Sequence, residues 1–210
     1  MTTINWSQLF KFRQEISKRY PAIWGLPIAP RYSDVLLGTD IKPATLLEVG
    51  AGDRGLQKKV VQRWPDCQYA SFDIDEHGNH DFSELSEITG EYDLICMFEV
   101  IEHVRPEVAL DILTKCLEVL KPGGQMMITT PNIFYPPGYL RDATHITPWC
   151  YDELGGIARL AGFEVSQLYR LYKEAILKRL LRRYLAYPLF RLLRIDFAKQ
   201  IMLVAAKPKV

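Results

Sequence analysis

The stretch Leu46-Leu47-Glu48-Val49-Gly50-Ala51-Gly52-Asp53-Arg54-Gly55 decides the fold of this chain. A short apolar run meets an acidic residue and then ends in a glycine-rich turn, which leads into a helical pattern. Glycines let the backbone of such a turn come close to a ligand, and the free N–H groups at the start of the next helix attract its polar groups. The pattern predicts a strand, a ligand-binding turn and a helix.

Glu48 distinguishes between two cofactors that such a turn could hold. Gly50-x-Gly52-x-x-Gly55 fits the dinucleotide fingerprint, and Asp73 follows about 20 residues later, where an acid would hold a ribose. A nicotinamide-binding strand is normally apolar at the position of Glu48, because a buried carboxylate without a partner is costly. S-adenosylmethionine carries an ammonium and a sulfonium group, so an acid at this position favours that cofactor over NAD.

Composition indicates one globular domain and gives no sign of a nucleic-acid-binding protein. The 210 residues carry a net charge of +1, and 48% of them are hydrophobic. The four cysteines are widely spaced without a Cys-x-x-Cys pair, so we expect reduced thiols and no metal site. No signal peptide is recognised, and no apolar run reaches the roughly 18 residues that a membrane span needs. These features predict a cytoplasmic location.

Strand-like and helix-like patterns alternate along the chain. Helices are expected over 5–20, 31–37, 54–64, 106–120 and 151–161, and strands over 44–49, 67–73, 93–98, 125–130, 163–171 and 201–206. This order predicts the α/β class, with a doubly wound, mainly parallel sheet. Residues 1–40 are expected to form a helical segment or lid, and residues 41–210 the main domain.

Several motifs in order resemble those of class I S-adenosylmethionine-dependent methyltransferases. They are Leu46–Gly52, Phe72-Asp73-Ile74-Asp75, Tyr92–Ile95 with Glu99–Val104, Leu120–Gly124 with Thr129–Asn132, His145–Trp149 and Ala161–Val165. The resemblance covers about residues 40–170. It implies a Rossmann-like fold with an antiparallel final strand. Only Ile74 to His80 separate the acidic motif from Asp81-Phe82, which is too short for a crossover of about a dozen residues, so the third strand is expected to be absent, vestigial or displaced.

The resemblance also implies cofactor contacts. Glu48 would meet the methionine amino group, the backbone of Gly50, Ala51 and Gly52 would pass along the methionyl and ribose parts, and Asp73 with its neighbour Ile74 would hold the ribose side. Asp81 and Phe82 would bind the adenine edge, and Met97 and Phe98 would lie near the reactive methyl group.

Several of these positions have structural alternatives. Glu48 could cap the following helix, Asp73 could be a turn residue that Asp75 replaces, and Asp81 could be an ordinary loop acid. Phe98 could belong to the core. Arg54 stands where many family members have a third glycine, and we expect it to begin the helix and point outward, with Gly55 serving the helix.

Two histidines are candidate catalytic bases. His145 lies in a polar loop after the fifth strand, where family members build the acceptor site, and His103 follows the fourth strand. Histidine titrates near neutral pH, so either could remove the proton of an acceptor hydroxyl. Asp142 could orient His145. Alternatively, His145 anchors its loop and His103 packs at a helix start, and some family members need no base.

Residues 173–195 depart from the core pattern because basic residues alternate with leucines and aromatic residues. This stretch belongs to a basic helical insertion at about 172–198, and within 173–195 it contains seven Lys or Arg residues and one acid, Glu174. Leu177, Leu180, Leu181, Tyr184 and Leu185 are expected to share one helical face. Three interpretations remain open: a cap on the sheet or on a partner subunit, a peripheral contact with an anionic membrane on its inner face, and a site for an anionic substrate such as a diphosphate-linked glycan. Nucleic acid is not expected, because no RNA-binding module accompanies the charge.

The sequence therefore predicts methyl transfer from S-adenosylmethionine to a small-molecule, glycan or lipid-linked acceptor, on oxygen. The alternatives are methylation of nitrogen or carbon, and a catalytically silent cofactor-binding partner protein.

Overall fold

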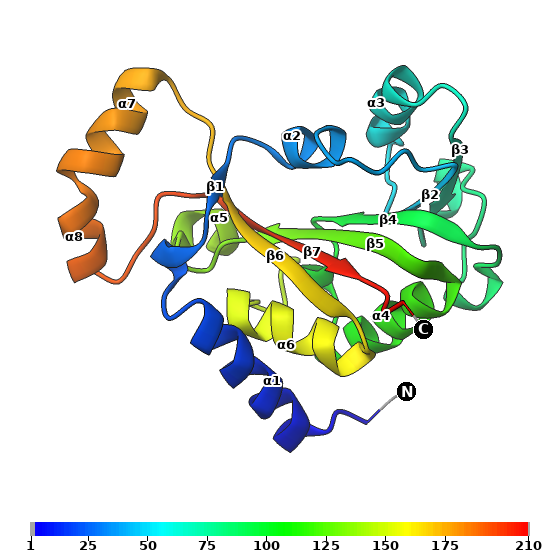
Figure 1. The fold of residues 1–210 in the computed structure, drawn as a ribbon, viewed down its shortest axis with the longest axis horizontal. Coiled ribbons are helices and arrows are strands. Elements are labelled where there is room, and N and C mark those ends of the chain that lie inside the picture. Colours follow the sequence, from blue (N-terminus) through cyan, green and yellow to red (C-terminus); the bar gives the residue numbers. More distant parts are fainter. Residues whose placement is uncertain (1–2, 210) are drawn as a thin grey trace.

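A computed structural model describes residues 3–209, apart from the side chains of Glu76, Ile176, Arg179 and Arg183. A seven-stranded sheet lies at its centre, with helices on both faces (Figure 1). The strands are β1 (Ile28–Ala29), β2 (Thr45–Val49), β3 (Gln68–Phe72), β4 (Tyr92–Phe98), β5 (Leu120–Pro131), β6 (Glu164–Leu171) and β7 (Gln200–Ala206). The α-helices are α1 (Trp6–Arg19), α2 (Tyr32–Leu37), α3 (Gly55–Arg63), α4 (Pro106–Val119), α5 (Pro136–Leu140), α6 (Tyr151–Ala161), α7 (Ile176–Leu180) and α8 (Tyr187–Leu192).

The strand order is β1-β6-β7-β5-β4-β2-β3, and β7 alone runs against its neighbours. The other pairs, β1 with β6, β2 with β3 and β4, and β4 with β5, are parallel. The α/β class, the Rossmann-like sheet and the antiparallel final strand are thus confirmed. The carboxyl ends of β2, β3 and β4 lie along one edge, where ligands of open α/β sheets bind.

Alternate residues of each central strand face two separate cores. Leu47, Ile95 and Met126 pack toward α1, α4 and α6, whereas Leu46, Leu94 and Met127 pack toward α2 and α3. All six side chains are at most 1% exposed, and each such buried aliphatic side chain contributes about 1.5–3 kcal/mol. This two-sided burial explains why the strands are apolar throughout, as is typical of parallel sheets covered on both faces.

The N-terminal segment joins the main domain in two places. Helix α1 lies across α6, where Gly155 and Gly156 leave room for Ile16 and for Leu9 and Arg13, respectively. Strand β1 extends the sheet beside β6. Residues 32–37 form a short helix, α2, close to the predicted helix over 31–37. The role of a lid stays a prediction.

The third strand of the resembled fold is reduced to one bridge between Phe72 and Phe82. The Phe82 N–H donates to the Ser71 carbonyl oxygen, and the Asp73 N–H donates to the Phe82 carbonyl oxygen. The expectation of a vestigial strand is confirmed. Its physical reason is the short connection, which contains only a 3-10 turn over Glu76–Gly78.

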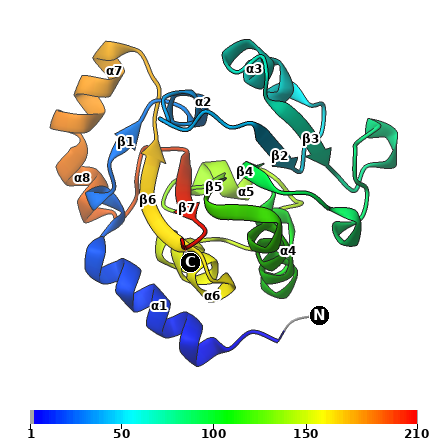
Figure 2. The ribbon, with the colours of Figure 1, turned by 45° about the vertical axis from the view of Figure 1, so that its right-hand side comes forward.

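The basic insertion forms an arm between β6 and β7, made of α7, a π-helical turn (Leu181–Leu185) and α8. Figures 1 and 2 show the arm at one end of the sheet, beyond β1, rather than over either face of it. Tyr187 and Phe190 pack against the small cluster around Phe197, with the Phe190 and Phe197 ring centroids 5.8 Å apart. The arm therefore packs at the β1 edge of the sheet, and a cap on a partner subunit stays a prediction.

Candidate functional site

The glycine-rich turn brings backbone groups to the carboxyl end of β2. Gly50 and Gly52 both have positive φ angles, of 74° and 46°. A Cβ atom on Gly50 would lie 2.1 Å from Cγ2 of Val100, so this glycine is required by packing. In front of Gly52, by contrast, a Cβ atom would meet nothing within 4 Å. The open side of the turn therefore lies at Gly52 and can admit a ligand close to the backbone.

Asp73 lies directly beside this open turn. The Gly52 N–H donates to Oδ2 of Asp73 at 2.8 Å, and the Asp75 N–H donates to Oδ1 at 3.0 Å. Asp73 is half-buried, and each carboxylate oxygen keeps a lone pair that can accept from a ribose hydroxyl. The next residue, Ile74, is 81% exposed and offers an apolar surface at the same place. The structure thus brings the first two motifs together as the resemblance implies.

Glu48 is buried next to the turn and accepts a hydrogen bond from the Tyr69 hydroxyl. Burial, with smaller contributions from the anions Asp53 and Asp73, raises the pKa of Glu48 to about 7 against the opposing effects of Tyr69 and Lys59. Helix α3 has no side-chain cap from Glu48, so that alternative does not apply. A carboxyl group with this pKa is partly protonated near neutral pH. A bound cation would favour its ionised form.

Arg54 stands at the start of α3 as expected, but the expected outward direction of its side chain was wrong. Arg54 precedes α3 in a left-handed conformation, and its guanidinium turns inward rather than outward. It donates to Ser71 Oγ at 2.7 Å, to the Asn79 carbonyl oxygen at 2.6 Å and to Asp81 Oδ2 at 3.3 Å. Because the third strand is missing, the loop needs another support, and Arg54 supplies it. Gly55 serves the helix as expected: its N–H donates to Asp53 Oδ1.

The candidate adenine and methyl residues divide into accessible and buried groups. Asp81 is exposed and accepts hydrogen bonds at Oδ2 from Ser71 and Arg54, while Phe82 packs against the main core as the vestigial strand. Phe98 is half-buried, with its ring centroid 4.5 Å from that of Tyr32. Met97 is completely buried in the core on the α4 face, so its side chain does not line a cavity, contrary to expectation. The period of two along β4 explains this division.

Both candidate bases line one cavity of about 520 Å³ at the ends of β4 and β5. The ring centroids of His103 and His145 are 4.8 Å apart. Nδ1 of His145 lies 2.8 Å from the Tyr139 carbonyl oxygen, and Nδ1 of His103 lies 3.2 Å from that of Thr144. Asp142 Oδ2 lies 3.8 Å from Nε2 of His145, beyond hydrogen-bond distance, so the orienting role of Asp142 stays a prediction. The two histidines, 42 residues apart in the chain, thus form one group.

Two glutamates of this cavity were not singled out as site residues from the sequence. Glu102 is completely buried, and burial together with the anion Glu99 raises its pKa to about 8. Glu99 has a φ of 56°, and burial raises its pKa despite hydrogen bonds from Gln200 and Thr129. The spacing Glu99-x-x-Glu102-His103 directly after β4 was the available signal, because side chains that follow parallel strands collect at one edge.

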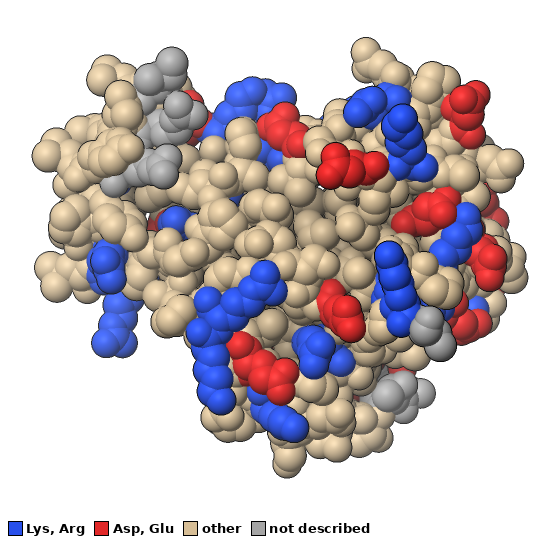
Figure 3. All heavy atoms as spheres, in the orientation of Figure 1, with Lys and Arg blue, Asp and Glu red and all other residues tan. Residues whose placement is uncertain are grey.

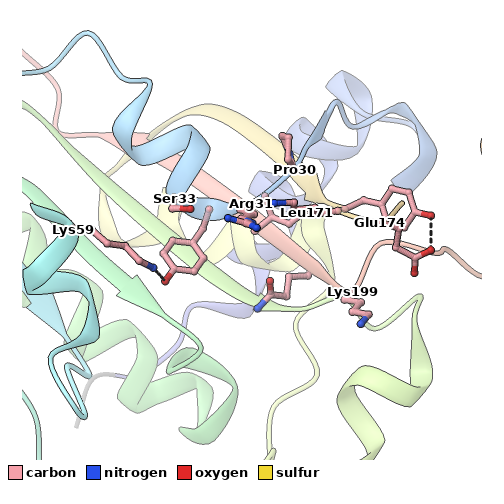
Figure 4. Close-up of a pocket in the computed structure, with 11 residues that line it drawn as sticks. Pro30, Arg31, Ser33, Lys59, Leu171, Glu174 and Lys199 are labelled. Atoms are coloured by element: carbon pink, nitrogen blue, oxygen red, sulfur yellow. Dashed lines mark hydrogen bonds between the residues drawn. The ribbon is translucent and has the colours of Figure 1, made fainter. Parts of the chain in front are cut away.

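A second cavity of about 440 Å³ adjoins the first, and Lys199 and Gln200 line both. Arg31 and Lys59 add to its basic wall (Figure 4). Lys173 also lines this cavity. Lys59 donates to the Tyr32 hydroxyl at 2.9 Å. The acid that lines the cavity, Glu174, accepts hydrogen bonds from Tyr172 and Arg182. This cavity is therefore suited to an anionic group of a ligand that also reaches the histidines.

Comparisons with known proteins agree with this geometry. A methyltransferase domain family matches residues 27–168, which is more than half of the chain. A probable S-adenosylmethionine-dependent methyltransferase of Mycolicibacterium smegmatis is 33% identical over 115 residues, which span 52% of this chain and 42% of that relative.

Solved structures share the fold at low sequence identity. A SAM-dependent methyltransferase from Archaeoglobus fulgidus has a TM-score of 0.62 at 17% identity, covering 95% of this chain and 94% of the other. Human N-acetylserotonin methyltransferase, solved in complex with SAM, has a TM-score of 0.60 at 16% identity, covering 96% of this chain and 56% of the other. The chain belongs to the methyltransferase domain family and has its class I, Rossmann-like fold.

Proposed function

We propose that this protein transfers a methyl group from S-adenosylmethionine to an oxygen of a small-molecule, glycan or lipid-linked acceptor. The observation that carries the proposal is the hydrogen bond between the Gly52 N–H and Asp73, with open space in front of Gly52. It supports a nucleoside site whose ribose lies at Asp73 and whose methionyl end reaches the ionisable Glu48. The sulfonium would then lie at the ends of β2 and β4, toward the cavity with the histidines.

Oxygen is favoured as the acceptor atom because the adjoining cavity holds groups that can remove a proton. The sulfonium is already a good leaving group, so alignment and exclusion of water supply much of the rate enhancement. A hydroxyl nucleophile additionally benefits from a base, and His145 or His103 would take its proton. The basic second cavity would hold a phosphate or carboxylate of the acceptor.

Calorimetric titration with S-adenosylhomocysteine tests the cofactor. We expect one site per chain and no comparable binding of NAD. The matched variants are Asp73→Asn, which removes the ribose acceptor and should weaken binding at least about tenfold, and Asp66→Asn on the α3–β3 loop, which should not. A folded protein that binds no S-adenosylhomocysteine would overturn the proposal.

Release of S-adenosylhomocysteine in the presence of candidate acceptors separates an enzyme from a silent partner protein. Hydroxylated acceptors that carry a phosphate should be turned over, whereas amine acceptors should not. Activity on amines alone would favour the nitrogen alternative. Cofactor binding without turnover of any acceptor class would favour the silent partner.

We also propose that the arm contacts an anionic membrane surface. Within residues 3–209 no helix is long and apolar enough to cross a bilayer. Instead, the arm exposes Leu177, Leu185 and Leu192 at 75–79%. Figure 3 shows basic atoms at the lower edge of the arm. Lys178, Arg191 and Arg194 are exposed nearby, and such an apolar face beside cations suits an interfacial position on anionic lipid. Two further arginines of the arm, Arg179 and Arg183, have side chains outside the described residues.

Vesicle sedimentation tests this surface. The protein should bind vesicles containing phosphatidylglycerol more strongly than pure phosphatidylcholine, and Leu177→Glu with Leu185→Glu should abolish the difference. Val61→Glu is the matched control, since Val61 is 48% exposed on α3, away from the arm. If the wild-type chain ignores both vesicles and forms a dimer that the arm variant dissolves, the partner-subunit interpretation replaces this one.

A further inference from the structure

The cavity that holds the histidines contains a cluster that acid–base chemistry leaves unexplained. Glu102 and His103 belong to a 3-10 turn directly after β4, and His145 comes from the loop after α5. One carboxylate oxygen and one ring nitrogen from each histidine all lie within 4.8 Å of one another. Three potential ligands from two separate segments thus converge on one point.

Glu102 is the most informative member of this cluster. Its side chain is completely buried, and neither of its carboxylate oxygens has a hydrogen-bond partner within the described residues. Glu99 Oε1, in the same cavity, is likewise buried without a partner. A buried carboxylate is costly unless it is paired or coordinates a metal ion. The nearest basic group is His103, whose Nε2 is 4.0 Å from Oε1 of Glu102.

The histidines are oriented in the manner of metal ligands. A backbone carbonyl oxygen can only accept, so the contacts of Nδ1 with Tyr139 and Thr144 place the protons of His145 and His103 on Nδ1. Each Nε2 then carries a lone pair. Outer hydrogen bonds from Nδ1 to carbonyl oxygens typically fix metal-binding histidines in this tautomer.

We propose that Glu102, His103 and His145 bind a divalent first-row transition-metal ion such as Zn²⁺ or Mn²⁺, with Glu99 available as a fourth ligand. Mixed imidazole and carboxylate ligands suit these ions better than Mg²⁺ or Ca²⁺, which prefer oxygen alone. Bonds of about 2.0–2.2 Å would require the side chains to draw together by a few tenths of an ångström to about 1 Å. His103, with a third of its side chain exposed, has room to move.

From the sequence we expected no metal site because paired cysteines are absent, whereas Glu99, Glu102 and His103 follow β4 closely and only His145 is distant in the chain. The role of the ion would rest on the proposed oxygen methylation: the ion would lower the pKa of an acceptor hydroxyl bound to it, and that hydroxyl would lose its proton to solvent water. In the metal-bound protein the Nε2 lone pairs are taken, so the histidines would be ligands rather than bases. Binding of the ion itself does not depend on that role.

Metal titration of the chelator-stripped full chain tests the inference without methyl donor or acceptor. Zn²⁺ or Mn²⁺, in competition with a chromophoric chelator, should bind one per chain, and Mg²⁺ should bind more weakly. Glu102→Gln keeps the shape of the side chain but removes its charge as a ligand, and His145→Gln removes one nitrogen. Each should weaken affinity by at least the 10- to 100-fold that loss of an outer partner costs. His77→Gln, an exposed histidine on another loop, is the control.

Cobalt substitution provides a second readout, because the visible bands of bound Co²⁺ report its ligands. These bands should appear in the wild-type chain and the His77 variant and be lost in the Glu102 variant. An unchanged affinity and spectrum in Glu102→Gln, or no binding to the wild-type chain, would overturn the metal site. Retained binding of S-adenosylhomocysteine shows that the variants are folded. Failure of that binding in the wild-type chain would instead count against the proposed function.

Discussion

Glu48 makes cofactor binding depend on pH at the scale of one residue. Its pKa of about 7 in the folded chain lies above its ordinary value of 4.5. The stability associated with the protonated form is therefore full below about pH 4.5 and lost as the pH rises through about 7. A cationic ligand favours the carboxylate, so affinity for S-adenosylhomocysteine should increase from pH 6 to pH 8.

Calorimetry at several pH values checks this dependence. Glu48→Gln cannot ionise, so its affinity should be lower at pH 8 and should change less with pH than that of the wild-type chain. An equal pH dependence in both proteins would assign the effect to other groups, such as Glu99 or Glu102.

The two left-handed glycines should respond differently to alanine. Gly52→Ala adds a methyl group to open space and to a strained φ, at a cost of about 1–2 kcal/mol in stability. Gly52→Ala should nevertheless weaken the binding of S-adenosylhomocysteine strongly, because the added methyl group occupies space that the ligand needs. Gly50→Ala meets Val100 and should lower the melting temperature more. Thermal melts with and without ligand distinguish them, and the reverse order would contradict the assignment of the open side.

These residues also show what single positions reveal in a sequence. The acid before the glycines and the acid after the next strand could be recognised, because each follows a strand at fixed spacing. The inward turn of Arg54 could not, since it depends on a loop that only the missing third strand creates. Met97 and Phe98 are neighbours in the chain, so their side chains point to opposite faces of the sheet. An error of one residue in the predicted end of the strand therefore assigns the core residue to the cavity and the cavity residue to the core.

At the scale of elements, Arg54 joins the start of α3 to the loop that replaces a strand. Its guanidinium holds Ser71, Asn79 and Asp81, and hydrogen bonds from a charged donor contribute about 1.5–3 kcal/mol. In Arg54→Ala, amide hydrogens of residues 73–82 should therefore exchange faster while those of β4 remain protected. Lys58→Ala, on the exposed side of the same helix, should leave both unchanged. Protection of 73–82 equal to wild type would remove this role.

The elements themselves were largely predictable from periodicity. The helices over 5–20, 106–120 and 151–161 and the central strands appear within a few residues of their expected bounds. Strand β5 begins at Leu120 rather than 125, because Leu120 pairs with Tyr92 before the chain turns through the glycines. The position of the arm between the last two strands could be predicted from the sequence. That several of its leucine side chains are exposed could not be predicted from their spacing.

At the scale of the molecule, a buried ion pair and its hydrogen bonds join four segments that are distant in the chain. Arg170 on β6 donates to Asp196 at 3.0 Å and to the carbonyl oxygens of Trp24 and Leu26, and Asn132 donates to Asp196. Burial raises the pKa of Asp196 even though Arg170 opposes this. Such a buried pair contributes little net stability. Removal of one partner, however, leaves the other charge buried and unpaired, which is strongly destabilising.

Arg170→Ala should therefore lower the free energy of unfolding by about 3–5 kcal/mol, as measured in urea. The double variant Arg170→Met with Asp196→Leu should recover part of that loss, because no buried charge remains. Arg13→Ala, which breaks a part-exposed pair with Asp152, should cost about 1 kcal/mol or less. A double variant weaker than Arg170→Ala would show that the pair itself is strongly stabilising.

The site as a whole was less predictable than the fold. The meeting of His103, His145 and two glutamates depends on the path of the loop after β5, and no local pattern encodes that path. The basic second cavity likewise draws on Arg31, Lys59 and Lys173, which are far apart in the chain.

The reduced third strand has a consequence for association between molecules. A strand at the border of a sheet offers unpaired peptide groups to other chains, and long flat borders promote aggregation. In β3 the loop of residues 73–82 covers the border from Ser71 onward. The part left from Gln68 to Ala70 is about 10 Å long, at about 3.3 Å per residue, which is too short to template another strand. The loop that Arg54 holds therefore also prevents β3 from pairing with the same strand of another molecule.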